Sequence, residues 1–103
     1  MKPVVLITAA DLAPQALALL TEFEIVYAGK TPTEDDIVVL CRAHDPAAII
    51  VRYSKVGAPA MDAAPNLKVI SKHGSGTDTI DKVAANERGI KVVAATGANA
   101  AAV

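Results

Sequence analysis

The chain has 103 residues, of which 52% are hydrophobic and 3% aromatic, and its formal net charge at pH 7 is −1. This length suits one domain with its own core, and the hydrophobic fraction excludes an intrinsically disordered chain. The absence of a basic block argues against nucleic-acid or anionic-membrane binding, and no apolar run reaches the roughly 18–20 residues of a membrane-spanning helix.

The first half of the chain alternates apolar runs with helical spacing. Pro3–Thr8 is rich in β-branched residues and predicts a buried strand. A helix capped by Asp11 is expected to follow as far as about Leu20. Glu24–Ala28 then predicts the second strand of the same sheet.

The next helix is predicted from its first residues. Thr31 as N-cap, Pro32 as the first helical residue and Glu34 as the third form a capping-box pattern. The helix is expected to end near Arg42. The apolar run Ala47–Val51 predicts the third strand.

The second half repeats the alternation. A helix of one or two turns is expected at Pro59–Ala64, and Leu67–Ser71 predicts the fourth strand. Asp81 is suited to cap a helix that ends before Gly89, a residue favoured just beyond helix ends. Lys91–Ala94 predicts the fifth strand.

Strands that alternate with helices predict an α/β fold with right-handed crossovers. We expect a flavodoxin-like, doubly wound, five-stranded parallel sheet in the order 2-1-3-4-5, with helices on both faces, in preference to a Rossmann order. Residues 1–103 form a single domain in this prediction. The alanine-rich segment 97–103 is typical of a helix start and suggests a piece of a longer protein.

Ligands of such sheets bind beyond the carboxyl ends of the strands, and three known uses of the fold are excluded there. A phosphoacceptor receiver needs an acidic pair after the first strand and an aspartate ending the third, and the chain lacks them. A flavodoxin needs a glycine- and hydroxyl-rich loop after the first strand. A phosphocysteine carrier needs its cysteine there, whereas Cys41 lies late in the second predicted helix and is expected to be buried.

The loop KHGSGTD, residues 72–78, fits ligand binding better. Gly74 and Gly76 allow the main chain to turn its N–H groups toward an anion, and Ser75 adds a hydroxyl. This pattern predicts either a site for a small carboxylate or phosphate or a connecting turn alone. The dinucleotide fingerprint GxGxxG is absent.

Few other side chains suggest chemistry. Arg52, at the end of the third strand, is suited either to bidentate carboxylate binding or to a surface ion pair. His73 is a weak candidate for a general base, and His44 is expected to be structural. No cluster has metal-ligand spacing, so no metal is expected. The lone Cys41 excludes an internal disulfide, and with no signal peptide visible we expect a reduced, cytoplasmic protein.

Residues 67–103 resemble a segment of the D-isomer-specific 2-hydroxyacid dehydrogenases, the phosphoglycerate dehydrogenase group. That segment reads approximately LK-x-I-x-x-x-G-x-G-x-D-N-I-D, then A, RGI-x-V and G-x-N. The matching residues are Leu67, Lys68, Ile70, Gly74, Gly76, Asp78, Ile80, Asp81, Ala84, Arg88, Gly89, Ile90, Val92, Gly97 and Asn99. Upstream, IIVRYSKV at 49–56 is similar to the family's V-R-S-x-T-K-V.

The resemblance implies that residues 1–103 are the substrate-binding lobe of an NAD-dependent D-2-hydroxyacid dehydrogenase, truncated before the NAD-binding Rossmann domain. It implies that the main chain at Ser75 and Gly76, in the loop that starts at Gly74, binds the substrate carboxylate. Ser75 would also lie near the nicotinamide of NAD. Arg52 and Tyr53 would line the pocket for a small 2-hydroxy or 2-oxo acid.

The family's catalytic Arg, Glu and His follow this segment, so no catalytic residue is expected within the chain and the chain alone is expected to be inactive. The full enzyme is expected to be a homodimer, and the chain alone to expose apolar surface and dimerise. Thr79 replaces the usual Asn and Tyr53 the usual Ser, which leaves the acid undecided. The choice of NAD or NADP is expected to depend on residues outside this segment.

The competing hypothesis is a free-standing, non-enzymatic flavodoxin-like module that binds a small anion or a protein partner. The reading frame beyond residue 103 separates the two hypotheses. A GxGxxG within about 50 further residues favours the dehydrogenase, and a stop codon favours the module.

Overall fold

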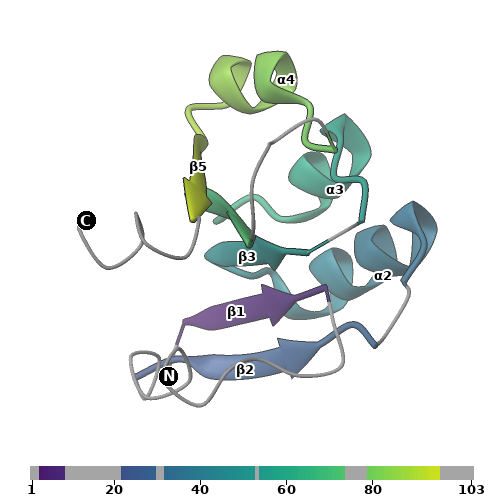
Figure 1. Cartoon of the computed structure of the whole chain (residues 1–103). Helices are drawn as coiled ribbons and strands as arrows, with labels where there is room; N and C mark the ends of the chain where they lie inside the picture. Colours follow the sequence, from purple (N-terminus) through teal and green to yellow (C-terminus); the bar gives the residue numbers. More distant parts are fainter. Residues whose placement is uncertain (1–2, 9–21, 30–31, 53, 74–78, 96–103) are drawn as a thin grey trace.

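The computed structural model describes residues 3–8, 22–29, 32–52, 54–73 and 79–95 (Figure 1). Within them the chain forms five strands and three helices. In chain order these are β1 (Val4–Ile7), β2 (Glu24–Tyr27), α2 (Glu34–His44), β3 (Ala48–Val51), α3 (Ala58–Ala63), β4 (Val69–His73), α4 (Lys82–Glu87) and β5 (Lys91–Ala95). The predicted helix at 11–20 and the alanine-rich segment 97–103 lie outside the described residues.

The five strands form one parallel sheet in the order β2-β1-β3-β4-β5, which confirms the predicted topology. β3 lies at the centre, where Ile49 is opposite both Leu6 of β1 and Ile70 of β4. Because all strands run the same way, their carboxyl ends meet at one edge of the sheet, which is where ligands bind in this class of fold.

The main core lies between the sheet and its three described helices. The fully buried side chains of Leu6, Ile49 and Ile70 pack in one cluster with Ile37 of α2 and Ala60 of α3. In Figure 1 these helices lie on the same side of the sheet. Burial of apolar area in this layer supplies most of the driving force for folding.

A smaller cluster covers the opposite face of β1. Val5 and Ile7 are buried there and pack against the partly buried Ile25 and Ile50 of the flanking strands. Successive side chains of a strand point to opposite faces, so an apolar run buried on both faces is expected at the middle of a parallel sheet.

The predicted start of α2 is wrong by half a turn. Thr33, not Thr31, is the N-cap: its hydroxyl accepts from the Asp36 N–H at 3.1 Å, and the Asp36 carboxylate accepts from the Thr33 N–H at 3.0 Å. Glu34 is the first residue of the helix, so the third helical position, which closes the box, belongs to Asp36. The reciprocal bonds of Thr33 and Asp36 satisfy two N–H groups at the start of the helix, which favours this cap.

The predicted ends of α4 are confirmed. The Asp81 side chain caps the helix by accepting from the Ala84 N–H at 3.0 Å, and Gly89 follows with φ of +71°, the left-handed conformation that glycine adopts at little cost. The other boundaries move by one or two residues. α3 starts at Ala58, and β4 continues to His73.

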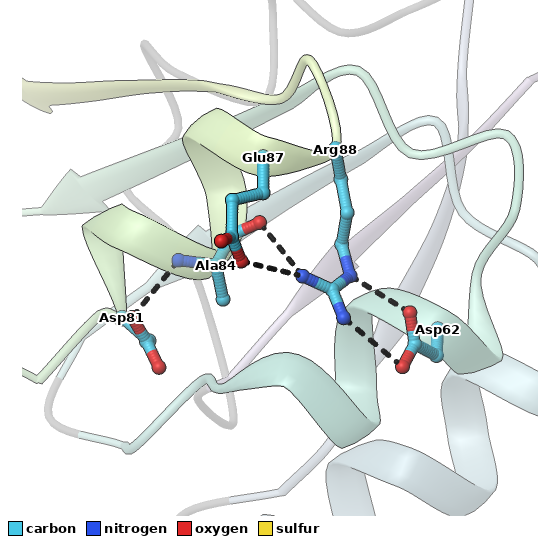
Figure 2. A network of polar contacts seen from close by, with 5 residues as sticks. All are labelled: Asp62, Asp81, Ala84, Glu87 and Arg88. Atoms are coloured by element: carbon cyan, nitrogen blue, oxygen red, sulfur yellow. Dashed lines mark hydrogen bonds and ion pairs between the residues drawn. The ribbon is translucent and has the colours of Figure 1, made fainter.

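Arg88 joins α4 to α3 (Figure 2). Its guanidinium donates to both carboxylate oxygens of Asp62, at 2.7 and 3.3 Å, and to the Ala84 carbonyl at 3.0 Å. The hydrogen bond from Arg88 lowers the pKa of the exposed Asp62 carboxyl and raises that of Arg88. This part of the family-like sequence, RGI, therefore has a structural role in this fold.

No helix of the described part is both long and apolar enough to cross a bilayer.

Candidate functional site

The carboxyl ends of β1, β3 and β4 bring three polar residues to one edge of the sheet. Thr8 follows β1, Arg52 follows β3, and Lys72 is the penultimate residue of β4, opposite Val51 in the register. These strands are neighbours in the sheet. The edge is therefore assembled from segments 20 or more residues apart in the sequence.

Thr8 ties the end of β3 to β1. Its hydroxyl, in a residue only 2% exposed, accepts from the Arg52 N–H at 3.1 Å, and its own N–H donates to the Ile50 carbonyl at 3.0 Å. The pair of bonds continues the ladder one residue beyond each strand. The main chain of Arg52 is therefore held in place, while the residue as a whole is exposed at the rim.

Lys72 holds the other side of the same residue. It is 7% exposed, and its ammonium donates a hydrogen bond to the Arg52 carbonyl. Ile70 and Lys72 are two residues apart in β4, so both side chains point to the face that the helices cover. The methylene stem of Lys72 can follow apolar surface while its ammonium reaches a polar partner.

The chain that leaves β3 makes a second fixed contact farther on. Val56 pairs with Ile80 in an isolated parallel bridge: the Val56 N–H donates to the Thr79 carbonyl at 2.9 Å, and the Asp81 N–H donates to the Val56 carbonyl at 3.0 Å. Both apolar side chains of the bridge are buried. The bridge therefore fixes the point from which the chain enters α4.

A shallow cavity of about 390 Å³ lies beside this bridge. Its charged lining residues are Glu34, Lys55 and Asp81. The Thr79 hydroxyl is buried, and among the described residues it has no hydrogen-bond partner. Charges of both signs line the cavity, so it lacks the uniformly positive surface that would favour a small anion.

The structure places only some of the predicted site residues. Arg52 lies at the carboxyl edge as expected. Tyr53, Gly74, Ser75 and Gly76 lie outside the described residues, so their proposed roles stay predictions.

Each of the two histidines is the last residue of a helix or a strand. His73 is the last residue of β4, next to the glycine loop in sequence, and His44 is the last residue of α2, exposed. No group of three His, Cys, Asp or Glu side chains suited to a metal ion occurs in the described ranges.

Lys72, like Thr8, is a residue of this edge that the sequence patterns did not single out. A lysine beside a glycine-rich loop is usually solvated, and nothing in its immediate neighbours indicated burial. The signal for burial of Lys72 was its position two residues after Ile70, on the face of β4 that points to the core. The strand continues beyond the predicted end at Ser71 and includes Lys72.

Cys41 is buried in the core and takes no part in this edge. Burial, with a smaller effect from the nearby Asp45 carboxylate, raises the pKa of its thiol to about 11. Thiolates react and thiols do not, so this cysteine is poorly placed for nucleophilic chemistry at neutral pH.

We expect the folded chain at pH 8 to react with a thiol-specific disulfide reagent at least about 100-fold more slowly than the chain in 6 M urea. The unfolded thiol ionises near its ordinary pKa of 9.0, whereas the folded thiol stays protonated up to about 11. The free energy of unfolding should therefore decline as pH rises from about 9 to 11, because the Cys41 thiol loses its proton at a lower pH in the unfolded state than in the folded state. Equal reaction rates at pH 8 in the two states would show that Cys41 is accessible.

The parallel sheet in the order β2-β1-β3-β4-β5 and the helices packed on it define an α/β domain. Residues 4–103 match the family D-isomer specific 2-hydroxyacid dehydrogenase, catalytic domain. The chain therefore belongs to this family of oxidoreductases.

This chain is similar to one known protein in sequence and to another in structure. D-3-phosphoglycerate dehydrogenase of Mycobacterium bovis is 38% identical over 98 residues, which are 94% of this chain and 18% of the relative. The PH0520 protein of Pyrococcus horikoshii OT3 superposes with a TM-score of 0.80 at 29% identity, over 95% of this chain and 29% of that one.

A third similarity concerns the fold alone. The NAD+-bound 3-phosphoglycerate dehydrogenase of Entamoeba histolytica has a TM-score of 0.76 at 24% identity, over 92% of this chain and 33% of that chain. The chain thus spans between about a fifth and a third of the length of these proteins.

Proposed function

We propose that this chain is the substrate-binding lobe of an NAD-dependent oxidoreductase that acts on a D-2-hydroxy acid. Membership of the dehydrogenase family supports the reaction class, and the resemblance of residues 67–103 to NAD-dependent dehydrogenases supports the cofactor. The observation that carries the proposal is the position of Arg52 at the carboxyl end of β3, beside the strand from which the glycine loop departs.

The carboxylate of the acid would be bound by main-chain N–H groups of Gly74, Ser75 and Gly76. Both ends of this loop are attached to the sheet region: β4 runs to His73, and Thr79 takes part in the bridge with Val56. A loop with fixed ends can present its amides to a carboxylate without a large loss of conformational entropy on binding.

Arg52 would add a charge-assisted contact to the bound acid. Its main chain is anchored by Thr8 and Lys72, so the guanidinium extends from a fixed point at the rim of the sheet. A guanidinium can donate two parallel hydrogen bonds to a carboxylate or phosphate, which orients the acid as well as binding it.

The described edge fits a small acid rather than a dinucleotide, because the GxGxxG turn that receives a dinucleotide pyrophosphate is absent from the sequence. A bound nicotinamide cofactor would supply the hydride chemistry, with the hydride passing from C2 of a 2-hydroxy acid to NAD+ or from NADH to C2 of a 2-oxo acid. In this proposal the cofactor is held mainly by a domain outside residues 1–103, and Ser75 alone comes near its nicotinamide. The groups that move the hydroxyl proton and polarise the carbonyl would also lie outside this chain, in a homodimeric enzyme.

The proposal is tested with the protein encoded by the full reading frame. We expect it to reduce NAD when supplied with 3-phosphoglycerate, glycerate or D-lactate, as followed by absorbance of NADH. Residues 1–103 alone should give no NADH under the same conditions. A full-length protein that binds one of these acids but reduces neither NAD nor NADP would instead favour the free-standing anion-binding module.

A further inference from the structure

The end of β3 is held from two directions by residues of two other strands. Thr8, after β1, accepts from the Arg52 N–H, and Lys72, in β4, donates to the Arg52 carbonyl. Both groups of the Arg52 peptide backbone thus contact side chains that are at least nine-tenths buried. Such contacts define the main-chain geometry more firmly than contacts with exposed side chains, which water competes for.

Placing an ammonium at this position has a cost. A lysine that is 7% exposed has lost most of its hydration, which strong polar contacts must offset. Ile70 points to the same face of β4 two residues earlier, and its apolar side chain is buried there without a desolvation cost. A lysine at this buried position therefore suggests a role that an apolar side chain would not fill.

We propose that Lys72 is a positioning residue that holds the carbonyl of Arg52 and thereby directs the guanidinium of Arg52 toward the substrate acid. This inference rests on the proposed function, and it adds a determinant that acts through Arg52. Lys72 also places a second positive charge below the rim, opposite Val51 in the register. Its ammonium strengthens the attraction of the edge for an anion without leaving its carbonyl partner.

The first test measures the main chain directly, by amide hydrogen exchange in residues 1–103. Lys72→Met removes the donor and keeps most of the side-chain volume. We expect the Arg52 amide to exchange at least about tenfold faster in this variant, while the amides of Ile49 and Ile70 keep their rates. Lys68→Met is the matched control, because Lys68 is exposed immediately before the first residue of β4 and its loss changes the net charge equally.

The second test measures kinetics in the protein encoded by the full reading frame. Lys72→Met should raise KM for the acid about tenfold and change kcat by less than about twofold, since a misdirected Arg52 weakens binding more than chemistry. Lys72→Arg, which keeps a cationic donor, should recover most of the loss. Lys68→Met should leave both constants unchanged.

These outcomes test the positioning role of Lys72 separately from the proposed dehydrogenase function. Unchanged exchange at Arg52, or faster exchange with an unchanged KM, overturns the positioning role even in an active enzyme. An inactive wild-type protein overturns the proposed function, and the exchange rates still decide whether Lys72 orders the end of β3. If Lys72→Met does not fold, Lys72→Gln takes its place, because its shorter amide keeps a polar end but does not reach the Arg52 carbonyl.

Discussion

Replacing Arg52 with glutamine in the protein encoded by the full reading frame is expected to lower kcat/KM for the acid about 100-fold. Arg52 is an exposed residue at the rim where the carboxylate should lie, and its guanidinium is positively charged. Glutamine supplies neither this charge nor two parallel N–H donors for a carboxylate. Loss of a charge-assisted contact of this kind is worth about 1.5–3 kcal/mol, or roughly 10- to 150-fold, and we expect the upper part of this range.

The control for this experiment is Arg42→Gln, which removes the same charge from the exposed last turn of α2, on a different element. Its kcat/KM should stay within about twofold of wild type. Thermal unfolding of both variants should match wild type, because both side chains belong to exposed residues. A change of less than threefold for Arg52→Gln would remove Arg52 from the site.

The largest effect on stability is expected from Ile49→Ala. Ile49 is fully buried at the centre of the sheet, opposite Leu6 and Ile70, and packs under the helices. Truncation removes three buried carbons and leaves a cavity between layers that can relax only in part. Substitutions of this type cost about 2–5 kcal/mol of unfolding free energy.

Urea unfolding followed by circular dichroism measures this change. Val39→Ala is the control: Val39 lies in α2 and is 60% exposed, so its truncation should change stability by no more than about 0.5 kcal/mol. A loss below about 1 kcal/mol for Ile49→Ala would contradict the central position of β3 in the core.

The strands and their order were predictable because short β-branched runs alternate with helical segments, and right-handed crossovers leave few topologies. The ends of α4 were also predictable, since an aspartate cap and a glycine in the left-handed region are local requirements of the helix. Asp81 and Gly89 meet them within their own segment. Neither depends on what the helix packs against.

Features that depend on contacts between distant segments were not predictable. The start of α2 is a local exception: it was expected at Thr31, and the reciprocal hydrogen bonds of Thr33 and Asp36 place it two residues later. The burial of Lys72 depends on the course of the chain after β3, which a pattern confined to β4 does not contain. The partner that Lys72 contacts, Arg52, lies 20 residues earlier in the chain.

The candidate site also has features that could be predicted from the sequence and features that could not. Arg52 at a strand end could be predicted because the ligand edge of a parallel sheet follows from strand direction alone. The anchors of its main chain, Thr8 and Lys72, come from two other strands and needed the three-dimensional register. Residues of the glycine loop were singled out from their composition, and their role in binding stays a proposal.

The most direct test of carboxylate binding by this loop is a titration of ¹⁵N-labelled residues 1–103 with D-glycerate, followed by NMR. The largest amide shifts should fall on Gly74, Ser75 and Gly76, together with the side-chain Nε–H of Arg52. Glycerol, which has the same carbon skeleton without the carboxylate, should produce none of these shifts. Equal shifts with both compounds, or glycerate shifts confined to other residues, would contradict carboxylate binding by the glycine loop.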